Sequence, residues 1–381
     1  MKPMRILVTG ATGYVGSRLV TELLSQGHDV VASSRNVDRL ADFGWNGDVT
    51  AVAMDAHDPA SAHAAFAEAG PVDVVYYLVH GIGQPDFRDA DNAAATNVAE
   101  AAKEAGVGRI VYLGGFVPEE GDLSEHLTSR AEVAAALSIQ GGPEVVWLGA
   151  AMIIGAGSTS FEMLRYVGDR FVVIPSTEWM NNPMDPISIT DVLYYLAIAA
   201  DADRVPAGAY DISGPETTTY RDLLAAYGRA TRKWRASVPI RGVDTGLASM
   251  LTAAVLPVPG GLAADLVASL DHPMTASDGL RDLVSDPPGG LVGIDDAIMR
   301  SLPNGKPQPV NALTDQHHLA DTDPGWAGGD TLRLRRLASS VTPPMARPFL
   351  GLINAVPGPV AAALRTGIDT LINLTPKAHL G

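Results

Sequence analysis

The fold of this chain is decided by the stretch RILVTGATGYVG, residues 5–16. Its first four residues predict a short buried strand, and apolar residues at helical spacing after Tyr14 predict a helix. Between them, Gly10 permits a tight turn, Gly13 lets the backbone approach a diphosphate, and Gly16 lets the helix pack closely on its strand. The pattern predicts a dinucleotide-binding turn with phosphates at the helix start, the alternative being a tight turn without a ligand. The predicted cofactor contacts from this turn are Gly10, Thr12, Gly13, Tyr14, Val15 and Gly16.

Composition limits the classes of protein that this chain can belong to. With 381 residues, of which 46% are hydrophobic, it can bury a large core in one or two domains. Its net charge of −16 argues against nucleic acid as the main partner. Without cysteine, disulfides, thiolate nucleophiles and Cys-based metal sites are not expected.

The sequence also gives an expectation for location. The chain enters its first predicted strand directly, so no signal peptide is expected at the start. No apolar run is long enough to cross a bilayer. We therefore expect a cytoplasmic protein.

Residues 1–150 alternate between strand and helix patterns with short connections. The predicted strands are 5–9, 29–34, 49–54, 72–79, 108–114 and 144–150, and the predicted helices are 14–26, 58–69, 89–106 and 123–139. This alternation predicts an α/β fold with a Rossmann-type doubly wound parallel sheet. In such a fold, ligands bind at the carboxyl ends of the strands.

The end of the second predicted strand bears on the choice of coenzyme. It carries Ser34 and then Arg35, where an acidic residue would hold the ribose hydroxyl of NAD. Because Arg accommodates a 2′-phosphate, we predict NADP(H) in preference to NAD(H), with Ser34 as an added donor. The alternative is that Arg35 is merely solvated. Asp38 lies beyond the strand end and is not assigned to the ribose.

The third and fourth predicted strands end in further candidate contacts. Asp55 either accepts from an adenine amine or caps the following helix, for which Asp58 is the better cap. His80 lies in a glycine-containing turn, either beside the cofactor or as a structural turn residue. The predicted contacts here are Asp55, Ala56, Leu78, Val79, His80 and Gly81.

These stretches resemble the short-chain dehydrogenase/reductase superfamily, in its atypical NAD(P)H-binding branch of NmrA-like and nucleoside-diphosphate-sugar-epimerase-like proteins. The shared features are the TGxxGxxG spacing of residues 9–16, the sequence YLVH at 77–80, Asn97, AGV at 105–107, RIVYLGG at 109–115, FEMLRY at 161–166 and ITDV at 189–192. The resemblance extends over roughly residues 4–300. It implies the fold and an NAD(P)H cofactor more strongly than any substrate.

The chain departs from this superfamily at the catalytic positions. Active members usually carry a Ser after the fifth strand and a Tyr-x-x-x-Lys on the next helix, whereas Gly114 or Gly115 and the pair His126 and Arg130 stand here. His126 is the candidate general acid, because its ordinary pKa lies near neutrality. Arg130 is the candidate holder of the ribose, and Gly114 is predicted to approach the cofactor. Alternatively, both side chains are remnants of a site that binds cofactor without turnover.

The pattern becomes irregular after residue 150. We predict a substrate-side lobe over 151–302, interleaved with the core, and a linker or irregular arm over 303–331. Met152, Phe161, Met163 and Tyr166 line an apolar pocket or belong to the core. No metal site is expected at the His317-His318 pair, because no rigid element fixes its ligands.

The last segment, 332–381, is basic in an otherwise acidic chain and carries an apolar helical stripe. It is predicted to be an amphipathic helical tail that packs on the body or on a second subunit, or else lies on an anionic membrane surface. The packing alternative is the more ordinary one.

Two functions remain open from the sequence. The first is an NADP(H)-dependent reductase of a small apolar carbonyl or enone substrate. The second is a non-catalytic NADP(H)-binding regulatory or assembly protein, in which the bound cofactor stabilises a surface for a protein partner.

Overall fold

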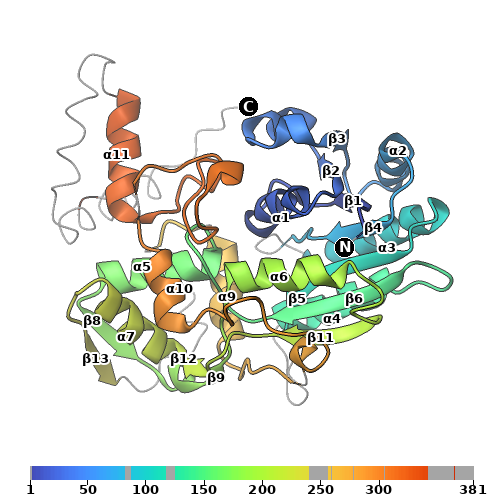
Figure 1. Ribbon diagram of the computed structural model, residues 1–381. Coiled ribbons are helices and arrows are strands. Elements are labelled where there is room, and N and C mark those ends of the chain that lie inside the picture. Colours follow the sequence, from blue (N-terminus) through green and yellow to red (C-terminus); the bar gives the residue numbers. More distant parts are fainter. Residues whose placement is uncertain are drawn as a thin grey trace.

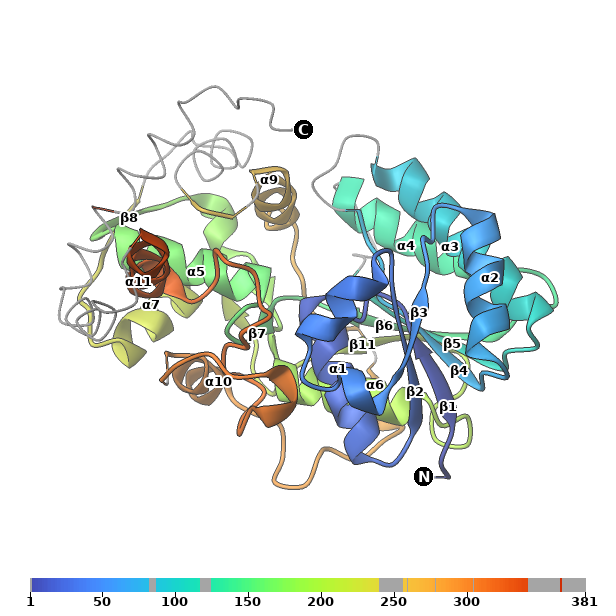
Figure 2. The same cartoon turned by 90° about the horizontal axis from the view of Figure 1, so that it is seen from above.

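The computed structural model describes residues 2–81, 87–116, 125–239, 256–258, 260–277, 279–303, 305–341 and 364. Two lobes lie side by side in both views, a sheet with helices on its two faces and a smaller lobe formed mostly by segments after residue 150 (Figures 1 and 2).

The larger lobe is built on a seven-stranded sheet in the order β11-β6-β5-β4-β1-β2-β3, and all neighbouring strands are parallel. The strands are β1 (Arg5–Val8), β2 (Asp29–Ser34), β3 (Thr50–Ala53), β4 (Val74–Tyr77), β5 (Arg109–Gly115), β6 (Glu144–Ala150) and β11 (Gly208–Ile212). The order reverses between β1 and β4, where a crevice forms at the carboxyl ends of the strands. The predicted Rossmann-type doubly wound sheet is confirmed.

Helices cover both faces of this sheet, as Figure 2 shows. One face carries α1 (Tyr14–Ser25) and α6 (Ile189–Ala199), and the other carries α2 (Pro59–Ala69), α3 (Phe87–Glu104) and α4 (Glu125–Leu137). Because side chains alternate along a strand, Ile6 and Val8 enter the core under α1 and α6, whereas Leu7 enters the opposite core. Burial on both faces explains why the strand sequences are continuously apolar.

The smaller lobe encloses a core of its own. It contains α5 (Thr159–Arg170), α7 (Tyr220–Ala230), α10 (Ile294–Arg300) and the strand pairs β7 (Ile153–Ile154) with β10 (Ile187–Ser188), β8 (Val173–Ser176) with β13 (Ala236–Pro239) and β9 (Pro183–Met184) with β12 (Thr218–Thr219). Phe161, Leu223 and Ile298 are fully buried in this core. Two further helices, α9 (Gly260–Ser269) and α11 (Gly329–Val341), contact α4 and α5 respectively.

The segment 305–323 is held by buried polar contacts with α1 of the larger lobe and with Ser188 of β10 in the smaller lobe. The Arg18 guanidinium on α1 forms an ion pair of 2.8 Å with Asp323, and both side chains are almost fully buried. The His317 ring contacts the Ser188 hydroxyl at 3.0 Å and the Asp315 carboxylate at 2.6 Å. Both ring nitrogens of His317 are therefore engaged by the protein, and the arm that the sequence predicted as irregular is held firmly in place.

Most of the predicted tail, beyond residue 341, lies outside the described residues apart from Leu364. In its described part, Arg333 is buried and contacts Asp330 at 3.4 Å, within α11. Among the described helices, none combines the length and apolar character that crossing a membrane requires.

Candidate functional site

The turn between β1 and α1 accepts only glycine at two positions. Gly10 adopts a φ of +66°, and a Cβ there would lie 2.8 Å from the Leu78 carbonyl oxygen. A Cβ on Gly16 would overlap the Gly10 carbonyl oxygen. The turn is closed by the Gly13 N–H, which donates to the Gly10 carbonyl at 2.9 Å. The helix start is thereby pressed against the turn and against the end of β4.

The amino end of α1 is left open for an anion. Gly13 is its N-cap and provides no side-chain hydrogen bond, and the first turn of the helix contains no acidic residue. The first N–H groups of a helix have no acceptor within the helix, and the helix dipole makes this end positive. This geometry suits a phosphate or diphosphate.

Two hollows meet over this turn and form one groove. We call the first the β2-side hollow, of about 570 Å³. The second, the β5-side hollow, has a volume of about 240 Å³. Both are lined by Gly10, Gly13, Leu78 and His80, so they are continuous across the crevice.

The groove brings together the residues that the sequence singled out. The β2-side hollow is lined, among others, by Gly10, Thr12, Gly13, Ser34, Arg35, Asp55, Ala56, Leu78, Val79, His80 and Gly81. The β5-side hollow is lined, among others, by Gly10, Gly13, Tyr14, Val15, Gly16, Leu78, His80, Gly114 and Arg130. His126 lies in the first turn of α4, but its side chain is outside the described part of the structure.

The β2-side hollow has exposed cations at its rim. Arg35 and Arg39 both line it, and neither side chain has a hydrogen-bond or ion-pair partner among the described residues. Asp38 does not line the hollow. Asp58 rather than Asp55 caps α2, accepting from Ala60 N–H at 3.0 Å. The capping alternative for Asp55 is therefore wrong, and its carboxylate accepts from His57 N–H at 3.1 Å.

The β5-side hollow is bordered by a buried cation. Arg130 is 6% exposed, and no described carboxylate lies within ion-pair distance of it. Burial raises the pKa of the nearby Asp91 carboxyl, and the Arg130 charge opposes part of that rise. Desolvation, and then the Arg130 charge, lower the pKa of the His80 imidazole to about 4. A neutral imidazole and a cation therefore lie beside this hollow at neutral pH.

Two predicted contacts differ in what they can offer a ligand. The ring of Tyr14 lies 4.1 Å from the Arg18 guanidinium, and its hydroxyl is buried beside Gly155. Tyr14 can therefore reach a ligand in the groove through its backbone but not through its hydroxyl. A Cβ on Gly114 would lie 2.6 Å from the Trp147 indole nitrogen, in the core beneath α3 and α4. At Gly115 the nearest atoms would be 3.8 Å away, so Gly115 is the position at which a side chain fits.

An apolar pocket of about 80 Å³ opens beside the β5-side hollow. The two share Gly115, Ala150, Ala151, Ser160 and Leu266. Met152, Met163, Met184 and Met274 line the pocket, and no charged residue is found among its described lining residues. Two of the predicted pocket residues, Phe161 and Tyr166, are fully buried and do not line it.

Several lining residues were missed in the sequence. Arg39 lies on a short 3-10 helix (Val37–Asp42) that begins two residues after Arg35, and a second arginine so soon after the strand end was the signal that could have revealed it. Leu266 and Met274 come from segments that only tertiary packing brings to the pocket. Nothing local in the sequence marks them.

Residues 10–136 match the family model described as NAD(P)H-binding. This part of the chain is an NAD(P)H-binding domain. Among solved structures, a nucleoside-diphosphate-sugar epimerase from Staphylococcus aureus has a TM-score of 0.62 at 19% identity, covering 78% of this chain and 100% of that chain. A triphenylmethane reductase from Citrobacter sp., complexed with NADP(H), has a TM-score of 0.60 at 21% identity with the same coverage of 78% and 100%. The fold predicted from the resemblance is confirmed.

Among curated relatives, an uncharacterized protein of Mycobacterium tuberculosis is 28% identical over 226 residues. The matched region covers 59% of this chain but only 23% of that protein. This chain thus matches about a quarter of a much longer relative.

Proposed function

We propose that this NAD(P)H-binding chain is an NADP(H)-dependent reductase of a small, mostly apolar carbonyl or enone substrate. The observation that carries the proposal is the methionine-lined pocket that opens at one end of the cofactor groove. A pocket in this position would hold a substrate next to the reactive ring of a dinucleotide.

The groove would bind the dinucleotide in a defined orientation. The glycine turn and the open end of α1 suit the diphosphate, and the β2-side hollow lies at the end of β2, where Rossmann folds hold the adenosine ribose. The nicotinamide end would then occupy the β5-side hollow, beside Arg130 and the apolar pocket. When bound there, NADPH supplies a hydride.

NADP(H) is favoured over NAD(H) by the cations at the rim of the β2-side hollow. Arg35 and Arg39 are exposed, and Ser34 adds a hydroxyl at the same edge. A 2′-phosphate would accept charge-assisted hydrogen bonds from a guanidinium, which are among the stronger polar contacts.

The coenzyme preference is tested by reversing one charge. For Arg35→Glu, we expect calorimetry to show that the Kd for NADPH rises at least about tenfold while the Kd for NADH is unchanged or falls, because an acidic residue at this strand end can hold the ribose hydroxyl of NAD(H). Arg204→Glu is the matched control, since Arg204 is also exposed and does not line the groove. Equal losses for both coenzymes, or equal losses in the two variants, would contradict the assignment of Arg35 to the 2′-phosphate.

The proposed roles at the nicotinamide end follow from charge. Arg130 would hold the ribose hydroxyls and keep this end of the groove positive, because a guanidinium does not release its proton near neutral pH. His126, one turn earlier on α4, or a bound water would donate the proton to the substrate oxygen or carbon.

The pocket also indicates the class of substrate. Its described lining offers thioethers, aromatic rings, leucines and small residues but no cation. A nucleotide-sugar substrate carries a diphosphate, which would need positive charge nearby. We therefore favour an uncharged substrate, for which flexible methionines give adaptable apolar contacts.

The test is NADPH oxidation by the full chain, followed at the absorbance of the reduced nicotinamide, with a panel of apolar aldehydes, ketones and enones. We expect turnover with at least one panel member and no turnover with nucleotide sugars. A loss of kcat in His126→Ala would assign the proton donor to His126, and an unchanged kcat would assign it to a bound water. Tight NADPH binding without turnover across the panel would instead favour the second function, a non-catalytic NADP(H)-binding regulatory or assembly protein. The glycines at the usual Ser position are the feature that keeps this second function in view.

A further inference from the structure

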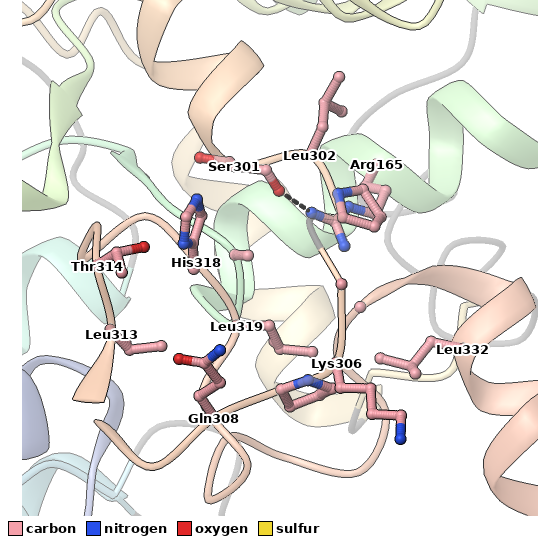
Figure 3. Close-up of a pocket in the computed structure, with 15 residues that line it drawn as sticks. Arg165, Ser301, Leu302, Lys306, Gln308, Leu313, Thr314, His318, Leu319 and Leu332 are labelled. Carbon is pink, nitrogen blue, oxygen red and sulfur yellow. Dashed lines mark hydrogen bonds between the residues drawn. The ribbon is translucent and has the colours of Figure 1, made fainter. Parts of the chain in front are cut away.

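We infer that a second cavity of this protein binds a small organic anion, a carboxylate or phosphate group carried on a short apolar body. The cavity lies where α5 meets the segment 301–332, and its volume is about 310 Å³ (Figure 3). This volume is at the lower end of the range for small-molecule pockets. We call it the Arg165 cavity.

The Arg165 cavity is separate from the cofactor groove. None of its lining residues lines the β2-side hollow, the β5-side hollow or the methionine pocket. Helix α5 connects them, because Thr159 and Ser160 in its first turn face the groove while Arg165 in its middle faces the Arg165 cavity. The inference therefore does not depend on the proposed reductase activity.

One donor at this cavity lacks an acceptor. Arg165 is 2% exposed, and its guanidinium donates to the Ser301 carbonyl at 2.6 Å and contacts Glu162 at 3.2 Å. Its Nε is buried and has no hydrogen-bond partner in the described part of the chain. A buried donor without an acceptor is costly, and it calls for a physical explanation. Arg165 lines the cavity, so an oxyanion bound there would lie beside its guanidinium charge.

The charges around the cavity favour an anion. Arg165 and Lys306 line it together with the His318 imidazole, and no carboxylate is found among its described lining residues. Glu162 lies behind Arg165 and is satisfied by the N–H groups of Gly157 and Gly328 as well as by the guanidinium. Lys306 is exposed and adds a positive charge at the rim. In a chain of net charge −16, a lining of this sign is unusual.

The leucines of the lining indicate that the uncharged part of the ligand is apolar. In Figure 3, Leu319 lies between the polar groups of Arg165 and His318 on one side and those of Lys306 and Gln308 on the other. Leu332 lies beside Lys306. A ligand that satisfies both kinds of surface needs a charged end and a short hydrocarbon part, whereas a bare ion would leave the leucines uncovered.

The test uses calorimetry on the full chain with hexanoate, hexyl phosphate and the uncharged hexanol. We expect at least one of the two anions to bind saturably and hexanol to bind at least about tenfold more weakly, because it lacks the charge-assisted hydrogen bonds. Comparing hexanoate with hexyl phosphate identifies which head group is preferred. Either preference supports the inference.

Two variants locate the binding. Lys306→Glu should weaken binding of the preferred anion at least about tenfold by charge reversal, and Leu332→Trp should weaken it by filling the cavity. Lys2→Glu is the matched control, since Lys2 is also exposed and does not line the cavity. NADPH affinity should be unchanged in all three, which shows that they remain folded.

Three results would overturn the inference. The first is the absence of binding heat for both anions, and the second is equally tight binding of hexanol. The third is an equal affinity of Lys306→Glu and Lys2→Glu for the preferred anion while both variants retain their NADPH affinity. Because the readout is direct binding, these failures are distinguishable from a failure of the proposed reductase activity.

Discussion

The two halves of the cofactor groove are formed by different parts of the protein, one mainly by backbone atoms and the other mainly by side chains. At the phosphate end, the shape comes from the main chain, through the left-handed Gly10, the close approach at Gly16 and the free N–H groups of α1. At the proposed nicotinamide end, side chains provide the positive charge and the apolar surface, chiefly Arg130 on α4 and the methionines around the pocket. The first half depends on a few consecutive residues, and the second on elements far apart in the sequence.

The substitution that we expect to impair phosphate binding most is Gly16→Ala. The added methyl group would overlap the Gly10 carbonyl oxygen, so the turn and the start of α1 must separate. We expect NADPH and NADH to lose affinity alike, by at least about a hundredfold, since misplaced main-chain donors cannot be replaced by a side chain. Calorimetry with each coenzyme measures this effect.

Gly47→Ala is the control for that substitution. Gly47 is exposed in a short 3-10 helix, Asn46–Asp48, and a Cβ there would meet no atom within 4 Å. We expect its coenzyme affinities to match those of the natural chain. If Gly16→Ala bound NADPH normally, the phosphates would have to be held elsewhere, and the difference between the two halves would disappear.

The same difference explains what the sequence could predict. The fingerprint at residues 9–16 is local, so its strand, turn and helix were recognisable without a structure. The strands predicted before residue 150 were readable because, apart from the edge strand β3, burial on both faces makes them largely apolar. The seventh, β11, is a half-exposed edge strand whose apolar signal is weak, and it was missed.

Side-chain sites depend on tertiary packing that no local pattern encodes. The segment around His317 was predicted to be an irregular arm, yet its contact with Ser188 of the smaller lobe and the buried pair of Arg18 and Asp323 at the larger lobe fix it in place. Arg18 and Asp323 are 305 positions apart in the chain, and each alone resembles an ordinary surface charge. The Arg165 cavity follows from this packing and was not predictable from the sequence.

A smaller effect is expected from the nicotinamide half. Replacing Arg130 with Met removes a buried cation beside the groove, and we expect the Kd for NADPH to rise about tenfold, equivalent to about 1.4 kcal/mol. Arg130→Lys keeps the charge and should recover part of this loss. Calorimetry at two salt concentrations separates the charge from packing, because only an electrostatic contribution weakens with salt. Equal losses in the Met and Lys variants would indicate a packing role instead.

The smallest expected effect concerns His80, which lines both hollows. A protonated imidazole at this place would attract the coenzyme phosphates. Desolvation, and then the Arg130 charge, lower the pKa of its imidazole to about 4, so the ring is uncharged from about pH 5.5 upward. The ratio of NADPH affinities between the natural chain and His80→Asn should therefore stay constant from about pH 5.5 to pH 8, and comparing ratios cancels the titration of the coenzyme itself. An imidazole with the ordinary pKa would become charged across this range and attract the phosphates, so the ratio would rise in favour of the natural chain as the pH falls. Such a rise, measured by calorimetry, would mean that the charge of the His80 side chain contributes to phosphate binding. The backbone donors alone would then not explain the affinity for the phosphates.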